Sequence, residues 1–288
     1  MKLPDFEYAA PSTPAEVVQL LASRRDDAKI IAGGQSLLPT MAFRLAQPKL
    51  LIDIRNLKGL NRITIDSSGV LLEARTRWRD IEDEEELKTA HPLLVEAVSH
   101  VAHYQVRNRG TVGGSLAHAD PAAELPCIAA TCEAELRLLG PGGERRVKAA
   151  EFFLGPLTTA LAEDEIILDV RLPPWPSERR WAFNEFARRR GDFALAGVAV
   201  FYDLDAQQRA CNPHIGVVGA CYYSKRSPLA ERALDGKFVN HETALTVAKI
   251  ASEEADPTSD FHASVQYRKA LVATLLERAL EEAARREN

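Results

Sequence analysis

The first third of the chain alternates between helical and strand-like spacing of its apolar residues. Thr13 can cap a helix, Pro14 suits the first helical position, and Glu16 stands three residues after the cap, as in a capping box. Residues 17–23 continue this helix, and Val17, Val18, Leu20 and Leu21 give it an apolar face. The same reading predicts short strands at 29–32 and 49–56, a short helix at 37–48, a hairpin at 60–75, and helices at 76–90 and 91–102.

The pattern of apolar and polar residues differs before and after residue 175. Residues 123–140 predict a helix and then a strand, and 165–173 predict a further strand. A proline cluster follows at 173–176, where we place a domain boundary. Beyond it, the spacing of apolar residues predicts antiparallel strands within 181–204 and 214–222. Helices are predicted at 244–255 and 265–287, the last with an apolar face of Leu271, Val272, Leu275, Leu276, Ala279 and Leu280 that packs on its own domain or docks another subunit.

Composition narrows the class of protein. The 288 residues are 46% hydrophobic and 27% charged, which suits about two globular domains. A net charge of −5 argues against nucleic acid as a partner. No apolar run reaches the length of about 18 residues that a membrane span needs, and no signal peptide is evident, so we expect a cytoplasmic protein without a membrane span.

The four cysteines do not suggest a metal site. Cys127, Cys132, Cys211 and Cys221 match neither zinc spacing nor the run of thiolates that holds an iron–sulfur cluster. We therefore expect reduced, mostly buried thiols and no metal ligand in this chain.

Two glycine pairs are the candidate ligand-binding motifs of the chain. AGGQS at 32–36 follows a predicted strand and precedes a helix, and TVGGS stands at 111–115. A glycine pair in such a turn lets the backbone approach a ligand, and successive N–H groups form a cradle for a phosphate or diphosphate. Neither the GxGxxG nor the GxxxxGK[ST] pattern occurs, which disfavours a Rossmann site and a P-loop. Taken singly, each pair is also compatible with a tight turn that binds nothing.

The wider context of these pairs is more specific. The segment QVRNRGTVGGSLAHADPAAELP (105–126), together with AGGQSLLPTM (32–41), closely resembles the FAD-binding medium subunit of the molybdenum hydroxylases, the family of carbon monoxide dehydrogenase and xanthine dehydrogenase. The resemblance extends over essentially the whole chain. It includes FEYAAPSTPAEVVQLLA (6–22), EIILDVRLP (165–173), FARRRGDFAL (186–195) and SVQYRKAL (264–271).

The resemblance implies an α+β fold in two parts. Residues 1–175 would form an FAD-binding domain of the vanillyl-alcohol oxidase/MurB type, with subdomains at about 1–55 and 56–175. Residues 176–288 would form a smaller C-terminal α+β domain with an antiparallel sheet.

The same resemblance implies that the two glycine stretches converge on one FAD. The first would wrap the pyrophosphate, the second would add N–H and hydroxyl donors, Glu124 would contact sugar hydroxyls, and Ile167 would lie near the isoalloxazine. No catalytic acid or base is implied. The cofactor residues carried over are Ile30, Ile31, Ala32, Gly33, Gly34, Gln35, Ser36, Leu37, Val101, Thr111, Val112, Gly113, Gly114, Ser115, Glu124 and Ile167.

Several neighbouring residues allow two interpretations. Some relatives carry a lysine near the flavin, and Glu185 is the nearest match here. A carboxylate there would lower the flavin potential, unless it faces solvent or pairs with an arginine. Asp120 can contact the ligand or cap a helix, and His118 can donate to the cofactor or be an ordinary loop residue. The run 188–190 is expected to be a solvated cluster of arginines.

The resemblance also implies partners. Two [2Fe–2S] clusters would lie on a small iron–sulfur subunit, and a molybdopterin cytosine dinucleotide cofactor on a large molybdopterin subunit, in a dimer of heterotrimers. Electrons would pass from the clusters to this FAD and on to an external electron acceptor. The alternatives are a free-standing FAD-dependent oxidoreductase with its own substrate, and a scaffold that has lost FAD.

Overall fold

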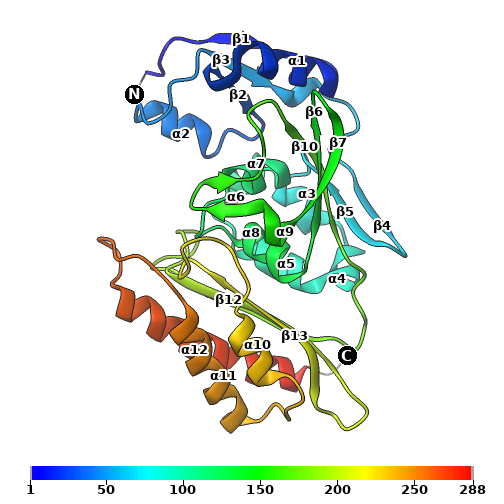
Figure 1. Cartoon of the computed structure of the whole chain (residues 1–288), viewed down its shortest axis with the longest axis vertical. Coiled ribbons are helices and arrows are strands. Elements are labelled where there is room, and N and C mark those ends of the chain that lie inside the picture. The colour runs from blue at the N-terminus through cyan, green and yellow to red at the C-terminus, as the bar shows by residue number, and fades with distance from the viewer. Residues whose placement is uncertain (1, 287–288) are drawn as a thin grey trace.

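The computed structural model describes residues 2–286, in which three bodies follow one another along the long axis (Figure 1). The first holds a parallel sheet of order β1-β3-β2, built from Glu7–Ala9, Leu50–Asp53 and Ala28–Ile31. Its helices are α1 (Pro14–Arg24) and α2 (Leu37–Ala42), with 3₁₀ turns at Arg25–Asp27 and Ile54–Asn56. As predicted, Thr13 caps α1, because its hydroxyl accepts from the Glu16 amide at 3.2 Å.

The second body is a five-stranded sheet covered by short helices. Its order is β4-β5-β10-β6-β7, and the predicted hairpin is confirmed as β4–β5. The strands are Ile63–Asp66 (β4), Gly69–Glu73 (β5), Glu135–Gly140 (β6), Gly143–Lys148 (β7) and Ile166–Leu172 (β10), with a small ribbon of β8 (Phe153–Gly155) and β9 (Thr158–Thr159). The helices are α3 (Trp78–Asp83), α4 (Leu87–Ala90), α5 (Pro92–His100), α6 (Tyr104–Arg107), α7 (Val112–His118), α8 (Glu124–Thr131) and α9 (Ala149–Phe152).

Two elements of this body differ from the expectation. The helix predicted over 76–90 is divided into α3 and α4, because Glu84 leaves the helical conformation with ψ 100°. It lies in an acidic run, and negative charge at the end of a helix is unfavourable. Strand β7 was not predicted, since only Val147 among its six residues is buried, as is common in a charged edge strand.

Strand β10 joins the first two bodies. Ile166 and Leu168 point into the core beneath the parallel sheet, whereas Ile167, Val170 and Leu172 belong to the core of the second body. A register shift between Ile167 and Asp169 accompanies this change of face. Because β10 is buried on both sides, the two subdomains share one strand.

The third body is an antiparallel sheet of order β11-β12-β13, from Arg180–Phe186, Ala196–Leu204 and Ala210–Val218. Helices α10 (Pro228–Leu234), α11 (His241–Glu254) and α12 (Val265–Arg285) cover one face (Figure 1). The apolar residues predicted on α12 pack on this sheet and on α11, which decides between the two roles left open for that helix. The α+β fold class and the antiparallel C-terminal sheet are confirmed.

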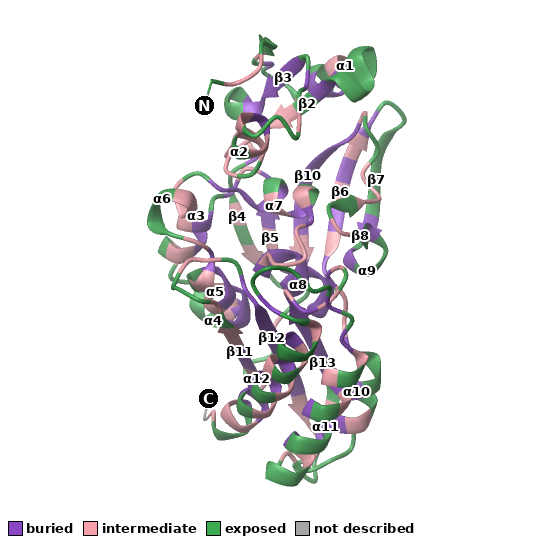
Figure 2. Cartoon of the chain, turned by 90° about the vertical axis from the view of Figure 1, so that its left-hand side faces the viewer, coloured by how far each residue is buried: buried purple, intermediate pink, exposed green. Residues whose placement is uncertain are grey.

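The other face of this sheet packs against the second body, so the sheet is buried on both sides (Figure 2). Phe183, Ala199, Phe201 and Val218 belong to the same apolar cluster as α5 and α8. Burial on both faces explains why β12 reads as a continuous apolar run. The two domains therefore share a continuous core.

An aromatic stack fixes the linker, residues 173–179, in this junction. The Trp175 ring lies 4.6 Å from the His91 ring and 5.2 Å from Phe201, measured between centroids. The Arg179 guanidinium lies 4.9 Å from the centroid of Trp175 and 4.4 Å from that of Phe201. Burial lowers the pKa of His91 to about 3, so its ring is neutral and accepts from the Leu94 amide at the start of α5.

Replacing Trp175 with alanine is expected to lower the free energy of unfolding by about 2–3 kcal/mol, since the stack would lose its central ring. Urea denaturation followed by circular dichroism measures this change. Phe261, which is 89% exposed, supplies the control. Phe261→Ala should change stability by less than about 0.5 kcal/mol, and an equal loss in both variants would contradict the role of the stack.

Candidate functional site

The first glycine loop leaves a row of backbone amides without acceptors. It follows β2 and turns into α2, and Gly34 takes φ +72°, a conformation that favours glycine. Among the hydrogen bonds of residues 2–286, none has the amide of Gly33, Gly34, Gln35, Ser36 or Leu37 as its donor. The loop is half-buried rather than enclosed. Consecutive free N–H groups of this kind suit a diphosphate.

The second glycine stretch is different, because it is the first turn of helix α7. Thr111 is the N-cap of α7, and it forms an isolated antiparallel β-bridge with Arg77. The amides of the next four residues all have acceptors: Val112 donates to Thr76 O at 2.9 Å, Gly113 to Ala74 O at 2.8 Å, Gly114 to Thr111 Oγ1 at 3.2 Å and Ser115 to Thr111 O at 3.0 Å.

This corrects one expectation. Residues 112–115 offer no second set of free amides, since the cap and the 74–76 backbone already use them. The hydroxyl groups of Thr111 and Ser115 remain as donors. That these residues contact the cofactor stays a prediction.

The two glycine stretches are joined by a backbone contact. A Cβ atom built on Gly33 would lie 2.1 Å from the carbonyl oxygen of Arg109, so only glycine allows the approach. The Arg109 side chain also donates to Gly33 O at 3.5 Å, and Gln35 donates to the same oxygen at 3.3 Å. The structure thus brings the predicted loops of the two subdomains together.

Sequence reasoning missed the residues that support this contact. A Cβ on Gly110 would lie 2.7 Å from Trp78 Nε1, and a Cβ on Gly113 would lie 2.7 Å from the Ala74 Cβ. Trp78 and Ala74 are therefore the surfaces against which the second stretch packs. Arg109 and Gly110 were part of the quoted motif, and their position before TVGGS was the available signal.

The remaining predicted residues lie on several elements of the first two bodies. Ile30 and Ile31 end β2, and Val101 is the C-cap of α5. Ile167 is only 3% exposed and lies in the apolar core with Val101 and Val112. Its proximity to the isoalloxazine remains a prediction.

Glu124 is the most distinctive of them. It begins α8, is 8% exposed, and has no partner from another residue in the described chain. Burial raises its pKa to about 7, and Asp120 adds to the effect, whereas His100 opposes it. A buried carboxyl without a partner is suited to accept hydrogen bonds from a ligand's hydroxyl groups.

Glu185 approaches Glu124 from the C-terminal domain. Its neighbour Asn184 reaches Glu282 on α12, and successive side chains of a strand point to opposite faces, so Glu185 faces α5 and α8. Its Oε2 atom is buried and has no hydrogen-bond partner within residues 2–286. Burial, followed by the neighbouring Glu124 carboxyl, raises the pKa of Glu185 to about 8. The oxygen is buried, and within residues 2–286 no arginine donates to it.

Three further residues have partners within the protein. Asp120 Oδ1 accepts from the Ala122 amide at 2.9 Å, and Arg189 pairs with Asp192 at 3.0 Å. Arg188 donates to the His262 carbonyl. His118 lies in the last turn of α7. All four cysteines are free, and Cys127 and Cys132 are buried.

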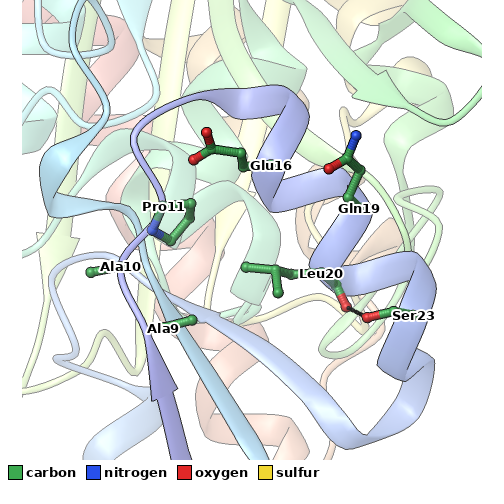
Figure 3. A pocket seen from close by; sticks show the side chains of 7 residues that line it. All are labelled: Ala9, Ala10, Pro11, Glu16, Gln19, Leu20 and Ser23. Carbon is green, nitrogen blue, oxygen red and sulfur yellow. Dashed lines mark hydrogen bonds between the residues drawn. The ribbon is translucent and has the colours of Figure 1, made fainter.

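A surface hollow lies elsewhere, between β1 and α1 (Figure 3). Two of its three polar side chains already have partners, because Glu16 accepts from the Ser12 amide at 2.8 Å and Ser23 donates to Leu20 O at 2.8 Å. The glycine loops do not line it. We therefore place the functional site at the junction of the loops. Among the helices of residues 2–286, none has the length and apolar character required to cross a bilayer.

Comparison with known proteins identifies the site. The family model described as "FAD binding domain in molybdopterin dehydrogenase" matches residues 4–175, and "CO dehydrogenase flavoprotein C-terminal domain" matches 181–283. The chain belongs to the FAD-binding medium subunits of the molybdenum hydroxylases. It is 40% identical to the nicotine 6-hydroxylase medium subunit of Paenarthrobacter nicotinovorans, over 99% of this chain and 100% of the relative.

Solved structures agree with this assignment. Carbon monoxide dehydrogenase from Hydrogenophaga pseudoflava contains a chain that superposes with a TM-score of 0.95 at 37% identity, covering 98% of both chains. Quinoline 2-oxidoreductase from Pseudomonas putida 86 gives 0.93 at 38% identity, covering 99% of this medium subunit and 98% of that chain. The medium subunit is thus an oxidoreductase subunit with an FAD-binding domain.

The residues of the junction fit this cofactor. The free amides of Gly33–Leu37 match a diphosphate, and the unpartnered carboxyl of Glu124 matches sugar hydroxyls. The medium subunit would hold FAD with these groups, and no metal ligand is needed.

The buried carboxyls predict a pH-dependent stability for the medium subunit without cofactor. Above about pH 4.5 the unfolded chain releases the protons of Glu124 and Glu185, whereas the folded chain keeps them until about pH 7–8. The free energy of unfolding should therefore fall between pH 5 and 8, by about 1.4 kcal/mol for each unit by which folding raises a pKa.

Glu185→Gln should make this fall smaller, as measured by urea denaturation across the pH range. Comparison of the two proteins isolates the effect, because the opposite contribution of His91 is present in both. The exposed Glu151 gives the matched control, and Glu151→Gln should follow the unmodified protein. Parallel curves for all three proteins would contradict the interpretation.

Proposed function

We propose that the medium subunit holds one FAD at the junction of its glycine loops and passes electrons from [2Fe–2S] clusters on a small iron–sulfur subunit to an external acceptor. A large molybdopterin subunit would perform the substrate chemistry, and the assembly would be a dimer of heterotrimers in the cytoplasm. Bound FAD would supply the ability to accept two electrons from a one-electron chain and deliver them together.

The row of five free amides is the observation that carries the proposal. Gly33–Leu37 would donate to the diphosphate, and the contact between Gly33 and Arg109 would hold the two loops in place. Fixed donors of this kind bind an anion without reorganising. Glu124 would accept from sugar hydroxyls, and Thr111 and Ser115 would add hydroxyl donors.

The number of cysteines in the chain supports the location of the iron–sulfur clusters on another subunit. Two [2Fe–2S] clusters need eight cysteine ligands at about four per cluster, and the chain has four cysteines in total, of which two are buried. Relatives carry names such as "Caffeine dehydrogenase subunit beta" and "Carbon monoxide dehydrogenase medium chain". On the first body, Phe43 and Leu45 are 68% and 81% exposed, which is typical of a surface that a partner covers.

Flavin binding is tested with a matched pair of glycine variants. Gly33→Ala places a methyl group against the Arg109 carbonyl and should weaken FAD binding at least about tenfold, corresponding to 1.4 kcal/mol or more. Gly142→Ala should bind normally, since a Cβ at Gly142 meets nothing within 4 Å. Titration of the apoprotein with FAD, followed by flavin fluorescence, measures both affinities.

Circular dichroism of the same samples shows whether each variant is folded. If Gly33→Ala has a native spectrum and binds FAD as tightly as Gly142→Ala, the loop is not the diphosphate site. If the unmodified chain binds no FAD, the proposed function fails.

The electron-transfer role is tested on the native assembly. We expect the complex purified from its source to contain iron, molybdenum and flavin, and its substrate to reduce the flavin. The medium subunit alone, loaded with FAD, should not react with that substrate. Isolation of an active subunit without metal-bearing partners would instead support a free-standing FAD-dependent oxidoreductase.

A further inference from the structure

The first glycine loop offers amides to an anion, but it carries no positive side chain. Residues 30–43 contain no lysine, arginine, aspartate or glutamate. The free amides of Gly33–Gln35 precede Ser36, the N-cap of α2, so they are not the ordinary unpaired amides of the first turn of a helix. A diphosphate is an anion, and the chain has a net charge of −5. A cation for this loop must therefore come from another part of the fold.

Arg109 is the cation that the contact between the subdomains brings to the loop. Its carbonyl oxygen lies so close to Gly33 that a Cβ there would be 2.1 Å away, which fixes the backbone of both residues. Its Nε atom donates to Gly33 O at 3.5 Å, and the side chain is otherwise exposed. The guanidinium therefore lies beside the loop, within reach of a ligand that the free amides bind.

The neighbouring arginines are already paired with carboxylates. Arg107 pairs with Glu82 at 3.0 Å, and Arg77 pairs with Asp80 at 2.7 Å. Among the ion pairs of residues 2–286, none includes Arg109. Its charge is thus available to a ligand without the loss of an existing ion pair.

We propose that Arg109 binds the diphosphate of the cofactor from the second subdomain, while the amides of Gly33–Leu37 bind it from the first. The inference rests on the proposed function, because that function places the diphosphate at this loop. A guanidinium presents parallel N–H groups to phosphate oxygens and stays charged at physiological pH. The bound cofactor would receive its amide donors from one subdomain and its counter-charge from the other.

Arg109→Gln is expected to weaken FAD binding at least about tenfold at low salt, because it removes charge-assisted hydrogen bonds. Arg109→Lys keeps the charge without the planar fork and should give an intermediate affinity. Arg232→Gln, which removes an exposed arginine from α10 in the C-terminal domain, should bind as the unmodified protein does. Titration of the apoprotein with FAD, followed by flavin fluorescence, measures all four affinities.

The salt dependence separates a charge effect from a packing effect. In about 1 M salt the Debye length falls to about 3 Å, so the contribution of an exposed charge is screened. The difference in affinity between the unmodified protein and Arg109→Gln should therefore shrink at high salt. A packing defect would give the same difference at both salt concentrations.

Protection from chemical modification supplies a measurement that needs no variant. Phenylglyoxal reacts with exposed guanidinium groups, and mass spectrometry of the peptides locates the modified residue. Bound FAD should protect Arg109 from the reagent and leave Arg232 as reactive as before.

Three results would overturn the inference. They are equal modification of Arg109 with and without FAD, a loss of affinity in Arg109→Gln that is independent of salt, and a natively folded Arg109→Gln that binds FAD as tightly as Arg232→Gln. In each case the unmodified chain still binds FAD, so the proposed function stands. Failure of the unmodified chain to bind FAD would instead remove the proposed function itself.

Discussion

The backbone of Gly33 lies against the carbonyl of Arg109, and the candidate site depends on this contact. It joins a loop of the parallel-sheet subdomain to the segment before α7. The second subdomain thereby supports the loop of the first, whose amides have no acceptors. Trp78 and Ala74 pack against Gly110 and Gly113, which lie in this segment and in α7. Donors fixed before the ligand arrives bind it without the cost of ordering a loop.

Shared apolar cores hold the three bodies together. Strand β10 contributes to the cores on both of its sides, and the C-terminal sheet is buried on both faces. The stack of His91, Trp175 and Phe201 fixes the linker between the domains. A cofactor between such bodies would keep constant surroundings, which suits the proposed role of holding a redox group at a set potential.

Much of the fold could be predicted from the sequence, because the capped helix at Thr13, the 60–75 hairpin and the face of the last helix are local patterns. The charged edge strand β7 could not, since only Val147 signals burial. For the site, both glycine pairs could be found, but not their different roles. That difference arises from the 74–76 backbone, which uses the amides of α7 and lies far from them in sequence.

Groups that lack partners lie on more than one element of the fold. A protein that served only to fold would gain by pairing the carboxyls of Glu124 and Glu185, since a buried polar group without a partner costs about 1–3 kcal/mol. The free amides of Gly33–Leu37 lie at the contact between the first two bodies, whereas Glu124 and Glu185 belong to α8 and β11. Departures from local stability are expected where a ligand completes the structure. Here one set of departures offers donors to an anion and the other offers acceptors to hydroxyl groups, and the proposed cofactor has need of both.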